Sequence, residues 1–198
     1  ALSCALRYEY DLVSNLLLNN SSINVNHVDK HGDSILLIAI DHLKEEIGTR
    51  IVKEFSVNLN YINKHGFDAI TLCITKRLRN LANLLIDKGV NTQHVSNLGD
   101  TSLIYALNND FADIAEKIIK NNNDNSTITA NGDIAFFHAI INGNEDIAKM
   151  MLEKGNSNFE VINSDNNTSL ILSLTGDMFS LSYQLVRLGS ENFIKHIN

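Results

Sequence analysis

The chain has 198 residues, of which 44% are hydrophobic and 20% charged, and its formal net charge is −7. This composition predicts one globular domain, and the acidic balance argues against a protein that binds duplex nucleic acid or an anionic membrane through a basic face. No apolar run approaches the roughly 20 residues that a membrane-spanning helix needs.

A turn sequence recurs along the chain at a nearly constant spacing. Glycine occupies it at Gly32, Gly66, Gly99 and Gly132, and Asn166 takes the same place in a fifth copy. Asparagine is the best substitute for glycine where the backbone turns left-handed. A period of 33 or 34 residues predicts a repeat protein in which each turn opens a new unit.

Apolar residues follow each turn in a fixed register, which predicts two short helices per unit. Four residues after the turn comes a large apolar side chain: Leu36, Ile70, Leu103, Phe136 and Leu170. Seven residues after it comes a small side chain, which lets the second helix approach the first: Ala39, Cys73, Ala106, Ala139 and Ser173. Apolar residues 15, 19 and 20 positions after the turn predict the second helix. Glycine or asparagine 23 positions after the turn predicts a left-handed C-cap in four of five units: Gly89, Asn122, Gly155 and Gly189.

In chain order, we expect a partial repeat over residues 1–28 and then repeats over 29–62, 63–95, 96–128, 129–162 and 163–198, all in one domain. In the partial repeat, Leu2 and Ala5 match Leu103 and Ala106, but the second helix matches only if one residue is missing. The chain begins with Ala1, and neither end carries the polar outer helix that terminal repeats normally need. We therefore expect a segment of a longer protein.

This pattern resembles the ankyrin repeat family. The period, the opening Gly99-Asp100-Thr101-Ser102-Leu103 and the stretch from Leu84 to Asn91 carry the resemblance, although the family's Thr-Pro-Leu-His motif is nowhere intact. The resemblance implies an all-α ankyrin-repeat solenoid, built of helix-turn-helix units that short β-turn or hairpin loops join.

The resemblance also implies a non-catalytic module or scaffold that binds a protein partner through a concave face of turn tips and first helices. The alternative is the recognition arm of a larger enzyme, channel or secreted effector whose activity lies outside this segment. The candidate contact residues flank the turns or end the first helices: Lys30, His31, Asp33, Asp41, His42, Lys64, His65, Phe67, Lys76, Asn97, Leu98, Asp100, Asn108, Asn109, Asn131, Asp133 and Asn142.

Two of these candidates are large apolar side chains at turn tips. Phe67 and Leu98 stand close to turn glycines, where neighbouring units carry Asp or Asn. Apolar anchors with a polar surround are typical of binding hot spots. Because the surrounding surface is rich in Asn and Asp, we expect a partner with a basic or hydrogen-bonding segment.

No pattern in the sequence predicts a cofactor, a metal or a catalytic site. His27 and His31 are four residues apart, but they fall in a predicted hairpin, where that spacing does not bring ligands together. Cys73 lies in the buried column of small residues, and no phosphate-binding loop or nucleophile elbow is present. Two cysteines are too few for a disulfide scaffold, which favours a reducing compartment, the cytoplasm. Delivery into a host cell as an effector remains an alternative.

Overall fold

A computed structural model describes the chain except for residues 21, 122–131, 156–161, 164 and 196–198. The described residues form twelve α-helices, and the strand pairing among them is limited to two isolated bridges, Val28 with Ser34 and Ile162 with Thr168. None of the described helices is both long enough and apolar enough to span a membrane. The helices are α1 (Leu2–Arg7), α2 (Asp11–Leu18), α3 (Ile35–Asp41), α4 (Glu45–Glu54), α5 (Ala69–Thr75), α6 (Arg79–Asp87), α7 (Ser102–Asn108), α8 (Ala112–Asn121), α10 (Gly132–Ile141), α11 (Glu145–Glu153), α12 (Ser169–Thr175) and α13 (Phe179–Lys195).

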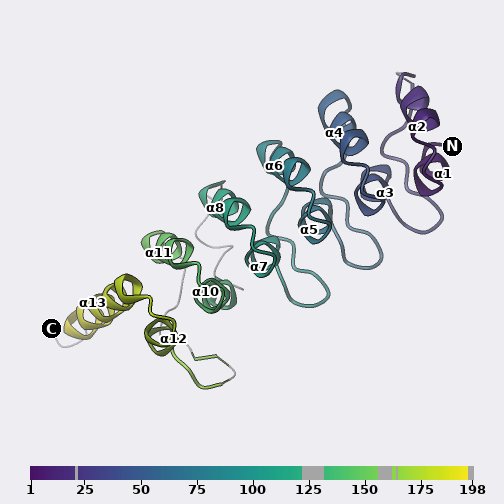
Figure 1. The fold of residues 1–198 in the computed structure, drawn as a ribbon. Helices are drawn as coiled ribbons and strands as arrows, with labels where there is room; N and C mark the ends of the chain where they lie inside the picture. The colour runs from purple at the N-terminus through teal and green to yellow at the C-terminus, as the bar shows by residue number, and fades with distance from the viewer. Residues whose placement is uncertain (21, 122–131, 156–161, 164, 196–198) are drawn as a thin grey trace. The chain divides into compact units, whose positions relative to one another are not determined.

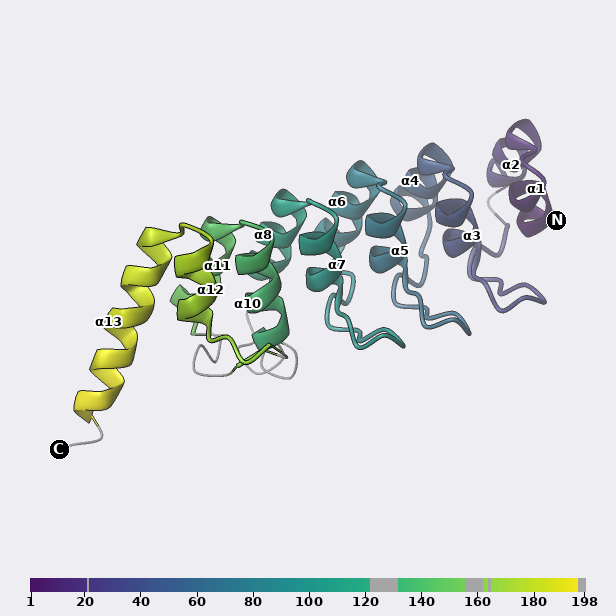
Figure 2. The same ribbon diagram turned by 60° about the horizontal axis from the view of Figure 1, so that its bottom comes forward.

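The chain divides into two compact units, residues 1–105 and 106–198. In the first unit, α1 pairs with α2, α3 with α4 and α5 with α6, and α3 packs between α1 and α5 (Figure 1). The turns that precede α3, α5 and α7 project on the same side of this unit (Figure 2). In the second unit, α10 pairs with α11 and α12 with α13, while α10 packs on α12 and α11 on both α8 and α13. The predicted all-α repeat fold is therefore confirmed.

The turns adopt the left-handed conformation that their residues predict. The φ angles are 84° at Gly32, 79° at Gly66, 87° at Gly99 and 60° at Asn166. A polar residue three positions before each of these turn residues closes the turn. Its side-chain oxygen accepts the backbone N–H groups of the second and fourth residues after it, at 2.9–3.3 Å. These acceptors are Asp29, Asn63, Ser96 and Asn163. The same local hydrogen bonds therefore shape four tips.

Small side chains bring the two helices of a repeat together. Ala39, Cys73, Ala106, Ala139 and Ser173 are fully buried, as the column predicts. A second column of small residues, nine positions later in each repeat, lies on the second helix and faces the first column. The contact between Ser173 and Ser182, whose hydroxyl oxygens lie 2.8 Å apart, shows this. That second column was not predicted; it consists of Ser14, Gly48, Ala82, Ala115, Ala148 and Ser182.

Replacement by alanine should change the free energy of unfolding in opposite directions at two serines of the second column. The Ser14 hydroxyl is buried and has no hydrogen-bond partner among the described residues, because Ala5 stands where Ser173 faces Ser182. Ser14→Ala is therefore expected to raise the free energy of unfolding by about 1 kcal/mol, and Ser182→Ala to lower it by a similar amount. Urea denaturation of both variants measures the signs, and equal destabilisation by the two would contradict this account.

The expected deletion in the first repeat was wrong. The N–H of Tyr10 donates to Ala5 O at 2.8 Å, as Lys44 does to Ala39 O in the next repeat. Helix α2 therefore begins in the same register as α4, with no residue missing. The apolar Leu12 caused the misalignment: it is 82% exposed on the outer face, where other repeats carry polar residues.

The predicted C-caps and the predicted turn at Gly132 are only partly confirmed. Gly89 and Gly155 end α6 and α11 with φ angles of 76° and 68°, which confirms two of the predicted C-caps, whereas Asn122 lies outside the described residues. Gly189 lies inside α13, because glycine permits a left-handed cap but does not impose one. Gly132 begins α10 instead of forming a turn. Its repeat carries Ile134 at the position where Ser34 and Thr168 cap their helices, and isoleucine has no side-chain oxygen that could accept a backbone N–H.

Candidate binding site

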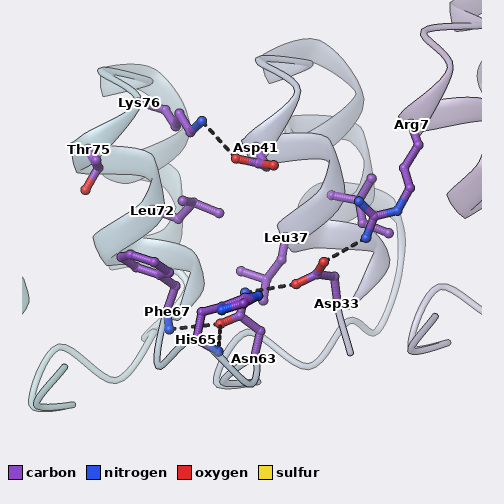
Figure 3. A pocket seen from close by; sticks show the side chains of 11 residues that line it. Arg7, Asp33, Leu37, Asp41, Asn63, His65, Phe67, Leu72, Thr75 and Lys76 are labelled. Atoms are coloured by element: carbon purple, nitrogen blue, oxygen red, sulfur yellow. Dashed lines mark hydrogen bonds and ion pairs between the residues drawn. The ribbon is translucent and has the colours of Figure 1, made fainter. Parts of the chain in front are cut away.

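A pocket of about 370 Å³ opens in the first unit, between the first helices of successive repeats (Figure 3). Its residues come from the end of α1, from α3, from α5 and from the turns before α3 and α5. They are Arg7, Asp33, Leu37, Ile38, Asp41, Asn63, His65, Phe67, Leu72, Thr75 and Lys76.

The floor of the pocket is apolar. Leu37, Ile38 and Leu72 are buried, and the Phe67 ring, half-buried, stands beside Leu72 at the edge of the cavity (Figure 3). Phe67 is thus part of a pocket wall and not a fully solvated tip residue. By contrast, Leu98 is 80% exposed and lies outside the pocket.

Ion pairs between successive repeats hold the sides of the pocket. The Arg7 guanidinium donates to Asp29 at 2.8 Å and to Asp33 at 2.7 Å. Asn63 Nδ2 donates to the other oxygen of Asp33 at 2.9 Å. Across the opening, Lys76 pairs with Asp41 at 2.8 Å. Both carboxylates that line the pocket are therefore already paired with the protein's own cations, although Arg7 divides its single charge between Asp29 and Asp33.

The carboxyl of Asp29 anchors this network. Its burial by itself raises the pKa, but the backbone N–H of Asp33 and the Arg7 guanidinium outweigh burial and hold the pKa below its ordinary value of 3.8. The charged form is thus the one that the fold stabilises.

Acid should weaken the first unit through this carboxyl. Because the folded pKa is depressed, the stability that Asp29 contributes is complete above the unfolded value and disappears as pH falls through the folded one. Asp29→Asn should lose about 1 kcal/mol at pH 7, and the variant should lose less further stability than the parent between pH 7 and pH 3. Urea denaturation at the two pH values tests this, with the fully exposed Asp146→Asn as a control that behaves like the parent. Parallel losses in parent and Asp29→Asn would contradict the assignment.

The structure brings five of the predicted contact residues together in the pocket: Asp33, Asp41, His65, Phe67 and Lys76. The remaining described candidates lie outside it and are exposed or half-buried: Lys30, His31, His42, Lys64, Asn97, Leu98, Asp100, Asn108, Asn109 and Asn142. Asn131 lies outside the described residues, and Asp133 falls in the first turn of α10.

Two of the outlying candidates have structural contacts. Asn97 donates to His65 O at 3.0 Å and lies so close to Gly66 that a Cβ there would meet its side chain at 2.6 Å. Asn142 donates to Leu107 O at 3.1 Å and so connects two repeats. Contacts between repeats are sufficient to explain both amides.

Sequence reasoning missed Arg7. The signal was available, because Arg7 occupies the same place in its repeat as Asp41, and the incorrect deletion in the first repeat did not affect that part of the alignment. What the sequence did not show is that the side chain reaches across 22 and 26 residues to two aspartates of the next turn.

Among the described residues, no three His, Cys, Asp or Glu side chains gather into a set that could hold a metal ion. Burial raises the pKa of the Cys73 thiol, with further contributions from the charges of Glu45 and Asp68, so that this thiol stays protonated. The pocket therefore has an apolar floor and a hydrogen-bonding rim.

Comparisons with known proteins agree with the repeat pattern. The family model described as ankyrin repeats (3 copies) matches residues 81–163 and 103–188. No curated protein sequence is similar to the chain at a significant level. Among solved structures, the chain is similar to EF0377, an ankyrin repeat protein, with a TM-score of 0.72 and 17% identity over 94% of this chain and 96% of that one.

Two further structures share the fold. One is described as the Bd0816 predatory endopeptidase from Bdellovibrio bacteriovorus in complex with immunity protein Bd3460; the TM-score is 0.68, at 23% identity, over 94% of this chain and 97% of that one. The other is the ankyrin repeat domain of Bcl-3, a member of the IkappaB protein family, with a TM-score of 0.65 and 18% identity over 86% of this chain and 76% of that one. At these identities the likeness establishes the fold alone.

Proposed function

The chain belongs to the ankyrin repeat family, and we propose that it is a non-catalytic module that binds a protein partner through the pocket between α3 and α5. Ankyrin repeats are protein–protein interaction modules, and one similar structure is described as a complex with an immunity protein. The observation that carries the proposal is the pocket itself, whose apolar floor is open while its charges are already paired.

The partner segment should present an apolar side chain with hydrogen-bonding groups beside it. Burying such a side chain against Phe67 and Leu72 removes apolar surface from water. His65 and Thr75 are exposed at the rim and offer hydrogen bonds. A basic group would have to compete with Lys76 for Asp41, so of the two chemistries expected for the partner, hydrogen bonding fits the pocket better than positive charge.

The other predicted contact residues would surround this anchor. Lys30, His31 and Lys64 are exposed on the same tips that carry Asp33 and His65, and they would form a polar rim of near-neutral contacts. We infer a cytoplasmic location for this module, because two cysteines are too few for a disulfide scaffold and so favour a reducing compartment.

Phe67→Ala is expected to weaken partner binding by about tenfold or more, equivalent to about 1.4 kcal/mol. Partners are first captured from a cell extract on the parent chain and identified by mass spectrometry; the affinity of each is then measured by calorimetry on parent and variants. Leu98→Ala is the matched control, since it truncates an exposed apolar tip residue outside the pocket. Because Phe67 is half-buried, its truncation should also lower folding stability slightly, and circular dichroism confirms that the variant is folded.

The two variants separate three outcomes. Loss of affinity in Phe67→Ala with affinity retained in Leu98→Ala supports the pocket. The reverse pattern would move the site to the Leu98 tip. A captured partner that binds Phe67→Ala as tightly as the parent would reject the pocket as the binding site.

A further inference from the structure

The second unit repeats the arrangement of the pocket with different side chains. Helix α10 lies beside α12 as α3 lies beside α5 (Figure 1). The pocket residues Asp41, His65, Leu72 and Thr75 therefore have counterparts at the same positions of the repeats in the second unit. In the same order these are Ile141, Asp165, Leu172 and Thr175, and we call these four residues the second-unit face.

Ile141 is an apolar residue at a polar position. It ends α10 and is 60% exposed. Its counterparts in the other repeats are all polar and bond to the protein: Arg7, Asp41, Thr75, Asn108 and Thr175. The position stays open inside the array, because Asp41 is exposed although α3 lies between α1 and α5. Stacking of repeats therefore does not cover Ile141.

The ion pair that spans the opening of the first pocket has no equivalent in the second-unit face. In the first unit, Lys76 pairs with Asp41 at 2.8 Å. At the same positions the second unit carries Gly176 and Ile141, so neither charge is present. Where a partner would have to displace an ion pair in the first unit, it meets an exposed apolar side chain in the second.

The charges of the second unit are separated by sign. Residues 106–198 carry twelve Asp or Glu but only six Lys or Arg. All six cations lie on second helices or directly after one: Lys117, Lys120, Lys149, Lys154, Arg187 and Lys195. The first helices and turn tips of this unit therefore contain no Lys or Arg. Asp165, exposed at a tip, forms no ion pair with any of the described residues.

We propose that the second-unit face binds a basic segment of the protein partner, with one apolar side chain against Ile141 and Leu172 and a Lys or Arg side chain at Asp165. This rests on the proposed function, because it assigns a second contact to the same partner. The occupant follows from charge complementarity, since Asp165 has no cation of its own on this face. In the first pocket, by contrast, a basic group would compete with Lys76 for Asp41.

Short fluorescent peptides test the proposal, with anisotropy as the measure of binding to the full chain. One peptide carries a leucine between lysines, a second has glutamates in place of the lysines, and a third has glycine in place of the leucine. The lysine–leucine peptide should bind most tightly, and raising the salt from about 0.01 M to about 0.15 M should weaken it.

Two pairs of variants locate the binding site of this peptide. Asp165→Lys should weaken binding about tenfold, whereas Asp146→Lys, the same charge change at a fully exposed residue of α11, should weaken it less than about twofold. Ile141→Thr, which introduces the residue found at this position in two other repeats, should weaken the lysine–leucine peptide about fivefold. Leu98→Thr should bind this peptide like the parent, because Leu98 is an exposed apolar residue of the first unit.

Three results would overturn the proposal. The lysine–leucine peptide could fail to bind the parent at concentrations up to about 1 mM. Equal losses in Asp165→Lys and Asp146→Lys would show attraction by net charge alone. Binding that is lost in Phe67→Ala but kept in Ile141→Thr would place the basic segment in the first pocket.

These results are independent of the test of the proposed function. That function is judged by the affinity of a captured partner for Phe67→Ala, a variant that should bind the lysine–leucine peptide like the parent. Circular dichroism shows whether each variant is folded. If Asp165→Lys does not fold, Asp165→Asn and Asp146→Asn form a milder pair, with the larger loss again expected at Asp165.

Discussion

Leu103→Ala is expected to lower the free energy of unfolding by about 2–5 kcal/mol. Leu103 lies in α7, is 5% exposed and occupies the column of large apolar residues that recurs four positions after each turn. Truncation removes its apolar surface from the core and leaves a cavity, since the helices around it are held by the other columns and can close only partly. Urea denaturation followed by circular dichroism measures the loss.

Leu98→Ala supplies the matched comparison for this prediction. The substitution is chemically identical and lies five residues away, but Leu98 is 80% exposed at a turn tip. Its stability should stay within about 0.5 kcal/mol of the parent. Equal denaturation midpoints for Leu103→Ala and the parent would mean that the large apolar column does not form the core.

The repeat register could be predicted from sequence because the same packing requirement recurs in each unit. A first helix that must bury one stripe and admit a second helix needs a large residue and a small residue at fixed positions, as Leu103 and Ala106 illustrate. Left-handed turns select glycine or asparagine, so Gly99 and Asn166 mark the same place in the backbone. The periodicity of the sequence was therefore enough to predict both the fold class and the order of the helices.

The errors in the predicted register lie where a local signal permits more than one structure. Leu12 looked like a core residue of α2, but it is exposed at a position that is polar in the other repeats, and this shifted the alignment by one position. Gly189 looked like a helix stop, although glycine only permits one. The start of α10 was misplaced in the repeat where Ile134 stands in place of the Ser or Thr that caps other first helices, a signal that the sequence contained.

The pocket was only partly predictable. Turn tips and first helices are exposed in any such array, so Phe67, His65 and Asp41 could be proposed from their positions alone. The sides of the pocket depend on long side chains that bind residues of another repeat. Arg7 donates to Asp33 in the next turn, and Lys76 forms an ion pair with Asp41. The sequence shows charges of both signs but not which of them pair, and that pairing decides which partner chemistry suits the pocket.

Ala106→Leu is expected to destabilise the protein by about 1–3 kcal/mol, although leucine is nearly as good a helix former as alanine. Ala106 is fully buried in the small column of the first helices. The Ser173–Ser182 contact shows that this column faces the small column of the second helices. Three additional carbon atoms at Ala106 must therefore push the two helices apart or adopt a strained rotamer.

Ala112→Leu isolates the packing effect, because Ala112 is exposed in the first turn of α8 and adds the same atoms where there is room. The control should stay within about 0.5 kcal/mol of the parent in urea denaturation. Gly48 shows the same restriction in the facing column, since a Cβ there would meet Leu81 Cδ2 at 2.8 Å. If Ala106→Leu were as stable as Ala112→Leu, the helices would have space between them, and small residues would not be a packing requirement of the repeat. Destabilisation confined to Ala106→Leu is the result that close helix approach demands.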